Sequence, residues 1–155
     1  MVALHTTPAT DHKSINQGNG VFVGHGHSKL FNEVLRYLTE DFGIEARYFE
    51  NCSISGEQVI PSLQRMLDEC GFAVIVATAE DESEDGIRAR QNVVHETGLF
   101  QGRLGFERVA ILKQVGVAHY SNLSGLLDIP FLGEGIDATF HKLGKQLRKF
   151  GYKQI

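Results

Sequence analysis

The chain has 155 residues, enough for one domain with a hydrophobic core of its own. Hydrophobic residues make up 42% and charged residues 22% of it, ordinary values for a globular protein. The net charge of −4 excludes the basic surface that nucleic acids and anionic membranes attract, so we expect neither as a partner.

Cysteine content and the N-terminal residues indicate the cell compartment and the domain limits. Cys52 and Cys70 form no CxxC pair, which favours reduced thiols in a cytoplasmic protein. The first 20 residues lack the apolar segment of a signal peptide, and no apolar run approaches the roughly 20 residues that span a bilayer. We expect a flexible tail over residues 1–19 and one domain over residues 20–155.

The first predicted elements are a strand, a helix and a second strand. Residues 21–23 are a short apolar run that predicts a buried strand. Apolar residues recur every fourth position over residues 29–42 and predict a helix, which Ser28 can cap and Gly43 can end. Residues 44–49 predict the second strand.

The middle of the chain predicts a second helix and the strongest strand. Ser55 and Gln58 have the spacing of a capping box for a helix that ends before Gly71. Pro61 leaves open whether this helix bends or begins nearer the proline. The continuous apolar run of residues 72–77 predicts a strand that is covered on both faces, as in a parallel sheet.

The C-terminal half predicts two helices and two strands. Residues 89–104 predict the third helix, whose buried positions are Val93, Thr97, Phe100 and Leu104. Residues 109–112 predict a strand, and residues 129–131 predict an edge strand because they contain a proline. Asp137 is the predicted cap of a last helix that turns inward Phe140, Leu143, Leu147 and Phe150.

This alternation predicts an α/β fold of the flavodoxin-like kind, a five-stranded parallel sheet with helices on both faces. In such folds ligands bind beyond the carboxyl ends of the strands, where the strand order reverses. Any site should therefore be built from residues 24–28, 50–56, 78–90 and 113–120.

The loop after the first strand reads Gly24-His25-Gly26-His27. His-x-His occurs in metal sites of barrel enzymes, but that fold needs about 250 residues, and no further ligand stands at a diagnostic spacing. We therefore expect no metal. The glycines let the backbone approach a ligand closely, and the next helix offers free N–H groups to an anion. A plain tight turn is the alternative.

An acidic run covers residues 80–85. Its simplest interpretation is a solvated loop. Arg88 and Arg90 follow it and are candidates either for ion pairs with the run or for binding a phosphate.

The third predicted helix carries a polar face beside its apolar one. Arg88, Asn92 and Glu96 recur at a spacing of four and share that face. Val93 and Phe100 shelter the Glu96 carboxylate, which places it for chemistry near the ligand end of the sheet. A surface ion pair between Arg88 and this helix is the alternative.

Several segments together resemble one family. In order they read VFVGHGHS, SGEQVI, GFAVIVATAED, ARQNVVHETGLFQGRLGFERVAILK and SNLSGLLDIPF. They are similar to the bacterial TIR-like family of predicted nucleotide-binding domains found in CD-NTase-associated and Pycsar anti-phage effectors. The resemblance covers about residues 20–155, and the third-helix segment is its most specific part.

The resemblance implies a TIR fold and an NAD+ glycohydrolase that cleaves the bond between nicotinamide and ribose. The family's catalytic glutamate maps onto Glu96, and the residue that packs against the nicotinamide ribose maps onto Asn92. A carboxylate suits this reaction because positive charge develops on the ribose in the transition state. The implied cofactor-binding residues are Gly24, His25, Gly26, His27, Phe49, Arg90 and Asn92. NAD+ is then the substrate, with no metal or other cofactor.

The resemblance also implies partners. Activity in this family depends on self-association through TIR–TIR contacts and on a cyclic-nucleotide sensor, either fused to the domain or separate. Two other functions stay open from the residues: a non-enzymatic TIR module for interaction or nucleotide binding, and a nucleoside deoxyribosyltransferase-like enzyme that also uses a glutamate.

Overall fold

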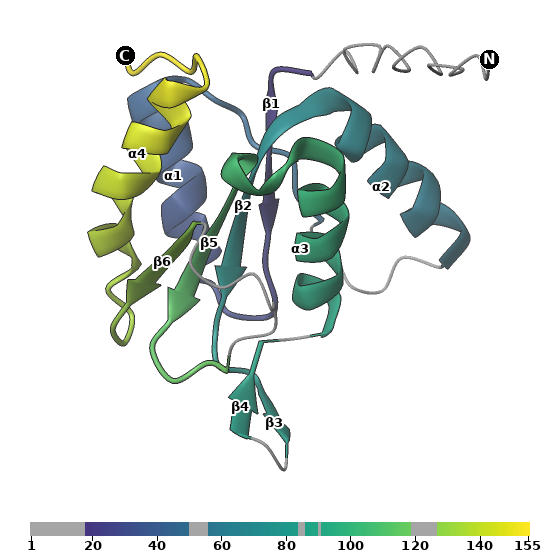
Figure 1. Cartoon of the computed structure of the whole chain (residues 1–155), viewed down its shortest axis with the longest axis vertical. Helices are drawn as coiled ribbons and strands as arrows, with labels where there is room; N and C mark the ends of the chain where they lie inside the picture. Colours follow the sequence, from purple (N-terminus) through teal and green to yellow (C-terminus); the bar gives the residue numbers. More distant parts are fainter. Residues whose placement is uncertain (1–17, 50–55, 84–85, 90, 119–126) are drawn as a thin grey trace, which may run out of the picture.

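The structure is a computed structural model with an α/β architecture, a parallel sheet flanked by helices on both faces (Figure 1). It describes residues 18–49, 56–83, 86–89, 91–118 and 127–155. The predicted tail over residues 1–19 falls almost entirely outside these residues.

Within the described residues the main sheet has four strands in the order β1-β2-β5-β6, all parallel. They are β1 (Gly20–Gly24), β2 (Cys70–Ala77), β5 (Val109–Gln114) and β6 (Asp128–Phe131). Helices α1 (Phe31–Phe42) and α4 (Phe140–Lys149) cover one face, and α2 (Gly56–Glu69) and α3 (Gln91–Leu104) cover the other (Figure 1). A short hairpin of β3 (Asp81–Ser83) and β4 (Gly86–Arg88) projects beyond the carboxyl end of the sheet (Figure 1).

The predicted second strand, residues 44–49, is reduced to a single parallel bridge between Arg47 and Phe22. Two backbone hydrogen bonds make the bridge, from Val23 N–H to the Arg47 carbonyl and from Arg47 N–H to the Val21 carbonyl, both 2.8 Å. The Phe49 carbonyl lies beside the His25 ring instead of continuing the ladder. The part of the chain that the structure describes thus has four parallel strands where five were predicted, but the flavodoxin-like order is kept, with its reversal beside β1.

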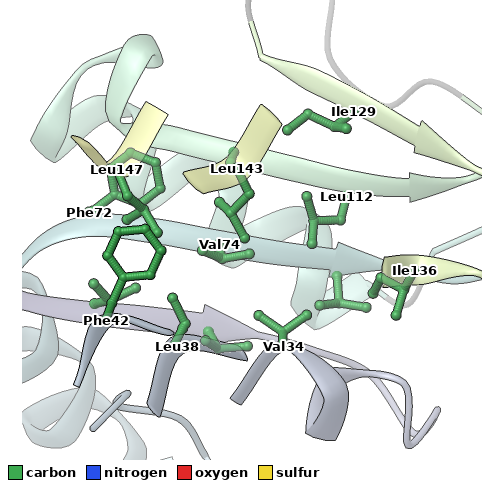
Figure 2. Packing of buried hydrophobic residues seen from close by; sticks show 14 of the residues in the cluster. Val34, Leu38, Phe42, Phe72, Val74, Leu112, Ile129, Ile136, Leu143 and Leu147 are labelled. Atoms are coloured by element: carbon green, nitrogen blue, oxygen red, sulfur yellow. The ribbon is translucent and has the colours of Figure 1, made fainter. Parts of the chain in front are cut away.

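The core between the sheet and the α1–α4 pair follows the predicted spacing. Val34, Leu38 and Phe42 point from α1 toward the sheet, opposite Leu143 and Leu147 of α4 (Figure 2). The strand residues between them include Phe72, Val74 and Leu112 (Figure 2). Gly43 ends α1 in the left-handed conformation, with φ of 62°, as predicted.

The other face positions the candidate site. Val93, Phe100 and Leu104 of α3 are buried as predicted, and the Phe100 ring stacks on Phe22 of β1 with centroids 4.3 Å apart. This stack fixes α3 across β1 and β2. The polar residues of α3 therefore meet the carboxyl end of β1.

The structure defines where two of the predicted helices begin. The α1 helix begins at Phe31, and the Ser28 hydroxyl accepts a hydrogen bond from the Leu30 N–H at 3.3 Å, so the serine caps the turn before it. The α2 helix begins at Gly56 and runs through Pro61, so the proline does not mark its start. Ser55, the first residue of the predicted capping box, lies outside the described residues.

The predictions for the acidic run and for the helix cap Asp137 were wrong. Asp81–Ser83 of the acidic run form β3, whose backbone pairs antiparallel with β4, with Asp81 opposite Arg88 and Ser83 opposite Gly86. Asp137 lies inside the short 3-10 helix η2 (Ile136–Thr139), so it is not the cap of α4, which begins at Phe140.

Candidate active site

The candidate site lies where β1 ends, beside β2 and under α3. Gly24 closes β1 and pairs with Ile75 of β2. The side chain of Glu96 reaches this point from the second turn of α3, so residues far apart in the chain meet at the strand-order reversal.

Gly24 makes room for the Glu96 carboxylate. A Cβ atom placed on Gly24 would lie 2.8 Å from Glu96 Oε2 and 2.8 Å from Ile75 Cδ1, closer than such contacts occur. The glycine was predicted to bring backbone close to a ligand. In the structure its missing side chain admits the carboxylate.

Glu96 is a buried acid. The residue is only 9% exposed, and its Oε2 atom is buried with no hydrogen-bond partner within the part of the chain that the structure describes. Burial raises the pKa of the Glu96 carboxyl to about 7, and a side-chain hydrogen bond with Asn92 opposes that rise. Burial therefore favours the neutral form of this carboxyl.

Asn92 connects Glu96 to the loop after β1. It lies one turn before Glu96 on α3, as predicted, and its Nδ2 donates to the backbone carbonyl of His25 at 3.4 Å. Its Oδ1 atom is buried and has no partner among the described residues. Asn92 thus contacts the His25 backbone through one hydrogen bond and the Glu96 carboxyl through another.

His25 is partly buried, and both of its ring nitrogens face backbone carbonyls. Its Nδ1 lies 2.7 Å from the Gly26 carbonyl oxygen and its Nε2 lies 3.1 Å from the Phe49 carbonyl oxygen. Carbonyl oxygens only accept, so the ring can only donate in these two contacts. The ring also stacks on Phe31, with centroids 3.6 Å apart and planes 4° from parallel.

The structure describes three of the four remaining predicted site residues, Gly26, His27 and Phe49. Gly26 is buried, whereas the His27 side chain is exposed. The Phe49 ring packs edge-on against Phe22 at 6.1 Å and so joins the core under α3. Arg90, the predicted phosphate-binding cation, lies outside the described residues.

Glu80 is a neighbour that the sequence analysis missed. Its Oε1 accepts the Ser28 N–H at 2.7 Å, and its Oε2 is buried without a partner among the described residues. It thus occupies one of the loop N–H groups expected to face an anion. The only signal was its position three residues after the end of β2, which the acidic run obscured.

The described residues contain no group of three or more histidine, cysteine, aspartate or glutamate side chains placed to hold a metal ion. Within the same residues, no helix combines the length and apolar character needed to cross a membrane.

Comparison with known proteins agrees with this architecture. Residues 20–132 match the family described as "CAP12/Pycsar effector protein, TIR domain". The chain belongs to this family of TIR domains. The matched TIR segment includes β1, α3 and every described residue of the candidate site.

Three relatives place the TIR domain in longer proteins. The uncharacterized protein YuaY of Escherichia coli is 27% identical over 114 residues, which are 69% of this chain and 38% of that protein. The Pycsar effector protein BcPycTIR of Burkholderia cepacia is 34% identical over 91 residues, 55% of this chain and 30% of its own length. The Pycsar effector protein PaPycTIR of Pseudomonas aeruginosa is 37% identical over 83 residues, which cover 50% of this chain and 27% of that protein. This chain thus aligns with about a third of each relative's length.

Proposed function

We propose that this TIR domain is an NAD+ glycohydrolase that cleaves the bond between nicotinamide and ribose, with Glu96 as its catalytic residue. The observation that carries the proposal is a buried carboxylate with one unpartnered oxygen among the described residues, held at the strand-order reversal of a TIR fold.

The environment of Glu96 suits an oxocarbenium-like transition state. Little water surrounds the carboxylate, so a positive charge developing on the ribose carbon interacts strongly with it. Because the nicotinamide of NAD+ is already cationic, it leaves as a neutral base and requires no general acid. The same cation favours the ionised form of a carboxyl whose pKa is about 7 in the free protein.

The groups around Glu96 support this role. Gly24 leaves the carboxylate space beside β1, and Asn92 holds it by a side-chain hydrogen bond. The loop after β1 would face the NAD+ substrate, but the Ser28 N–H already donates to the Glu80 carboxylate. A diphosphate bound at that N–H would have to displace the Glu80 carboxylate.

We place the reaction in an anti-phage or stress response, triggered when domains assemble. Two of the relatives are named as Pycsar effector proteins, and this chain aligns with only part of each. A cyclic-nucleotide sensor, fused or separate, would then supply the trigger in the cytoplasm.

The test is nicotinamide release from NAD+ at increasing protein concentration, with and without a crowding agent. We expect the rate per mole of protein to rise with concentration, because assembly completes the site. No release under any assembling condition would contradict the proposal and favour a non-enzymatic interaction module.

A further inference from the structure

The two histidines of the loop after β1 have different surroundings. The His27 side chain is exposed, whereas both ring nitrogens of His25 lie within hydrogen-bond distance of backbone carbonyls. Neither nitrogen of His25 is left for a ligand in this arrangement. A histidine in a nucleotide-facing loop would otherwise be taken as a ligand-binding residue.

The His25 ring bridges the loop after β1 and the segment around Phe49. Among the described residues, the Arg47 bridge is the last strand pairing between these two segments. One carbonyl belongs to Gly26 in the loop after β1, and the other belongs to Phe49, at the end of the segment that follows the Arg47 bridge. The stack on Phe31 fixes the plane of the ring against the first residue of α1. The ring therefore orients the backbone of its own loop from two directions.

The backbone of His25 then contacts the catalytic helix. Its carbonyl accepts from Asn92 Nδ2, and Asn92 shares a side-chain hydrogen bond with Glu96. A continuous series of contacts runs from Phe49 through His25 and Asn92 to the carboxylate. Displacement of the His25 carbonyl would leave the Asn92 amide without its second anchor.

We propose that His25 is a positioning residue, whose ring holds the loop so that its backbone carbonyl orients Asn92 and, through it, Glu96. His25 does not contact the substrate in this assignment. The effect on turnover rests on the proposed function, whereas the effect on Asn92 does not.

The first test uses His25→Phe, which keeps a planar ring for the stack on Phe31 but removes both nitrogens. The Asn92 side-chain amide is followed by ¹⁵N–¹H NMR, with His95→Ala as the control because His95 is exposed on α3, next to Glu96. We expect the Asn92 amide signals to shift and to exchange faster with water in His25→Phe only. Unchanged Asn92 signals in a folded His25→Phe would overturn the proposal, whatever the enzyme does.

The second test is a double-mutant cycle of His25→Phe and Asn92→Ala on nicotinamide release. His25→Phe should lower kcat about 10- to 100-fold and change KM for NAD+ less than about threefold, as expected for lost orientation. The double variant should be no slower than Asn92→Ala alone, because the two residues act in series. Additive losses, or a loss confined to KM, would mean that His25 acts independently or on the substrate.

His25→Gln keeps the test decisive if the phenylalanine variant does not fold. Its single amide nitrogen can donate to one of the two carbonyls, so the Asn92 shift and the kcat loss should be intermediate. Wild-type values of both in folded His25→Gln would contradict the two-sided clamp. If Glu96→Gln hydrolyses NAD+ normally, the proposed function fails, but the NMR comparison still tests His25.

Discussion

At the residue scale, the Glu96 carboxyl is removed from water on folding, and one of its oxygens gains no hydrogen bond from the described residues in return. Its ordinary pKa of 4.5 rises to about 7 because burial disfavours the charged carboxylate. Such a residue lowers the stability of the fold when ionised. Groups of this kind concentrate at functional sites, because a structural role alone gives no benefit that offsets the cost.

This cost predicts a pH-dependent stability difference between the wild type and Glu96→Gln. Below pH 4.5 the carboxyl is protonated in both the folded and the unfolded chain, so it contributes nothing. Between 4.5 and about 7 only the unfolded chain releases the proton, so wild-type stability falls as pH rises, by up to about 3 kcal/mol. Urea denaturation should show Glu96→Gln more stable than the wild type at pH 8, with the difference shrinking toward pH 5. A difference that is the same at both pH values would argue against a raised pKa.

At the element scale, the site depends on how closely β1 and α3 approach at Gly24. The Phe22–Phe100 stack brings the two elements together, and the absent Cβ of Gly24 leaves the space that the carboxylate fills. The proposed reaction would therefore depend on element packing as well as on the identity of residue 96.

Gly24→Ala tests this packing. The added methyl group should displace Glu96 and Ile75, lower the free energy of unfolding by about 1–3 kcal/mol, and reduce nicotinamide release at least about 10-fold. Gly98→Ala is the matched control on α3, since an added Cβ meets no atom within 4 Å and alanine favours a helix by up to about 1 kcal/mol. Normal turnover by folded Gly24→Ala would show that the carboxylate does not need this space.

At the scale of the whole molecule, the periodic segments were the predictable part. The four-residue spacing in α1 and the unbroken apolar run of β2 report burial directly, so helix, strand and fold class could be predicted from them. The Arg47 bridge could not, because one pair of hydrogen bonds leaves no periodic pattern.

Some features of the candidate site could likewise be predicted from the sequence, and others could not. The spacing of four put Asn92 and Glu96 on one helix face, and the resemblance to TIR domains singled out Glu96. Two other features could not be predicted: the contact of His25 with the Phe49 carbonyl and the hydrogen bond from the Ser28 N–H to Glu80. Both depend on the path of the backbone between distant segments, which residue types alone do not specify. For this reason the sequence predicted the residues of the loop better than their roles.

The central claim is that the Glu96 carboxylate breaks the nicotinamide–ribose bond. The most direct measurement is the rate of nicotinamide release at saturating NAD+ for the wild type, Glu96→Gln and Glu40→Gln, all at the protein concentration of highest wild-type activity. Glu40 is an exposed glutamate of α1 and controls for the loss of one carboxylate. We expect wild-type release by Glu40→Gln and a loss of at least about 100-fold in Glu96→Gln. Equal release by all three proteins would contradict the central claim.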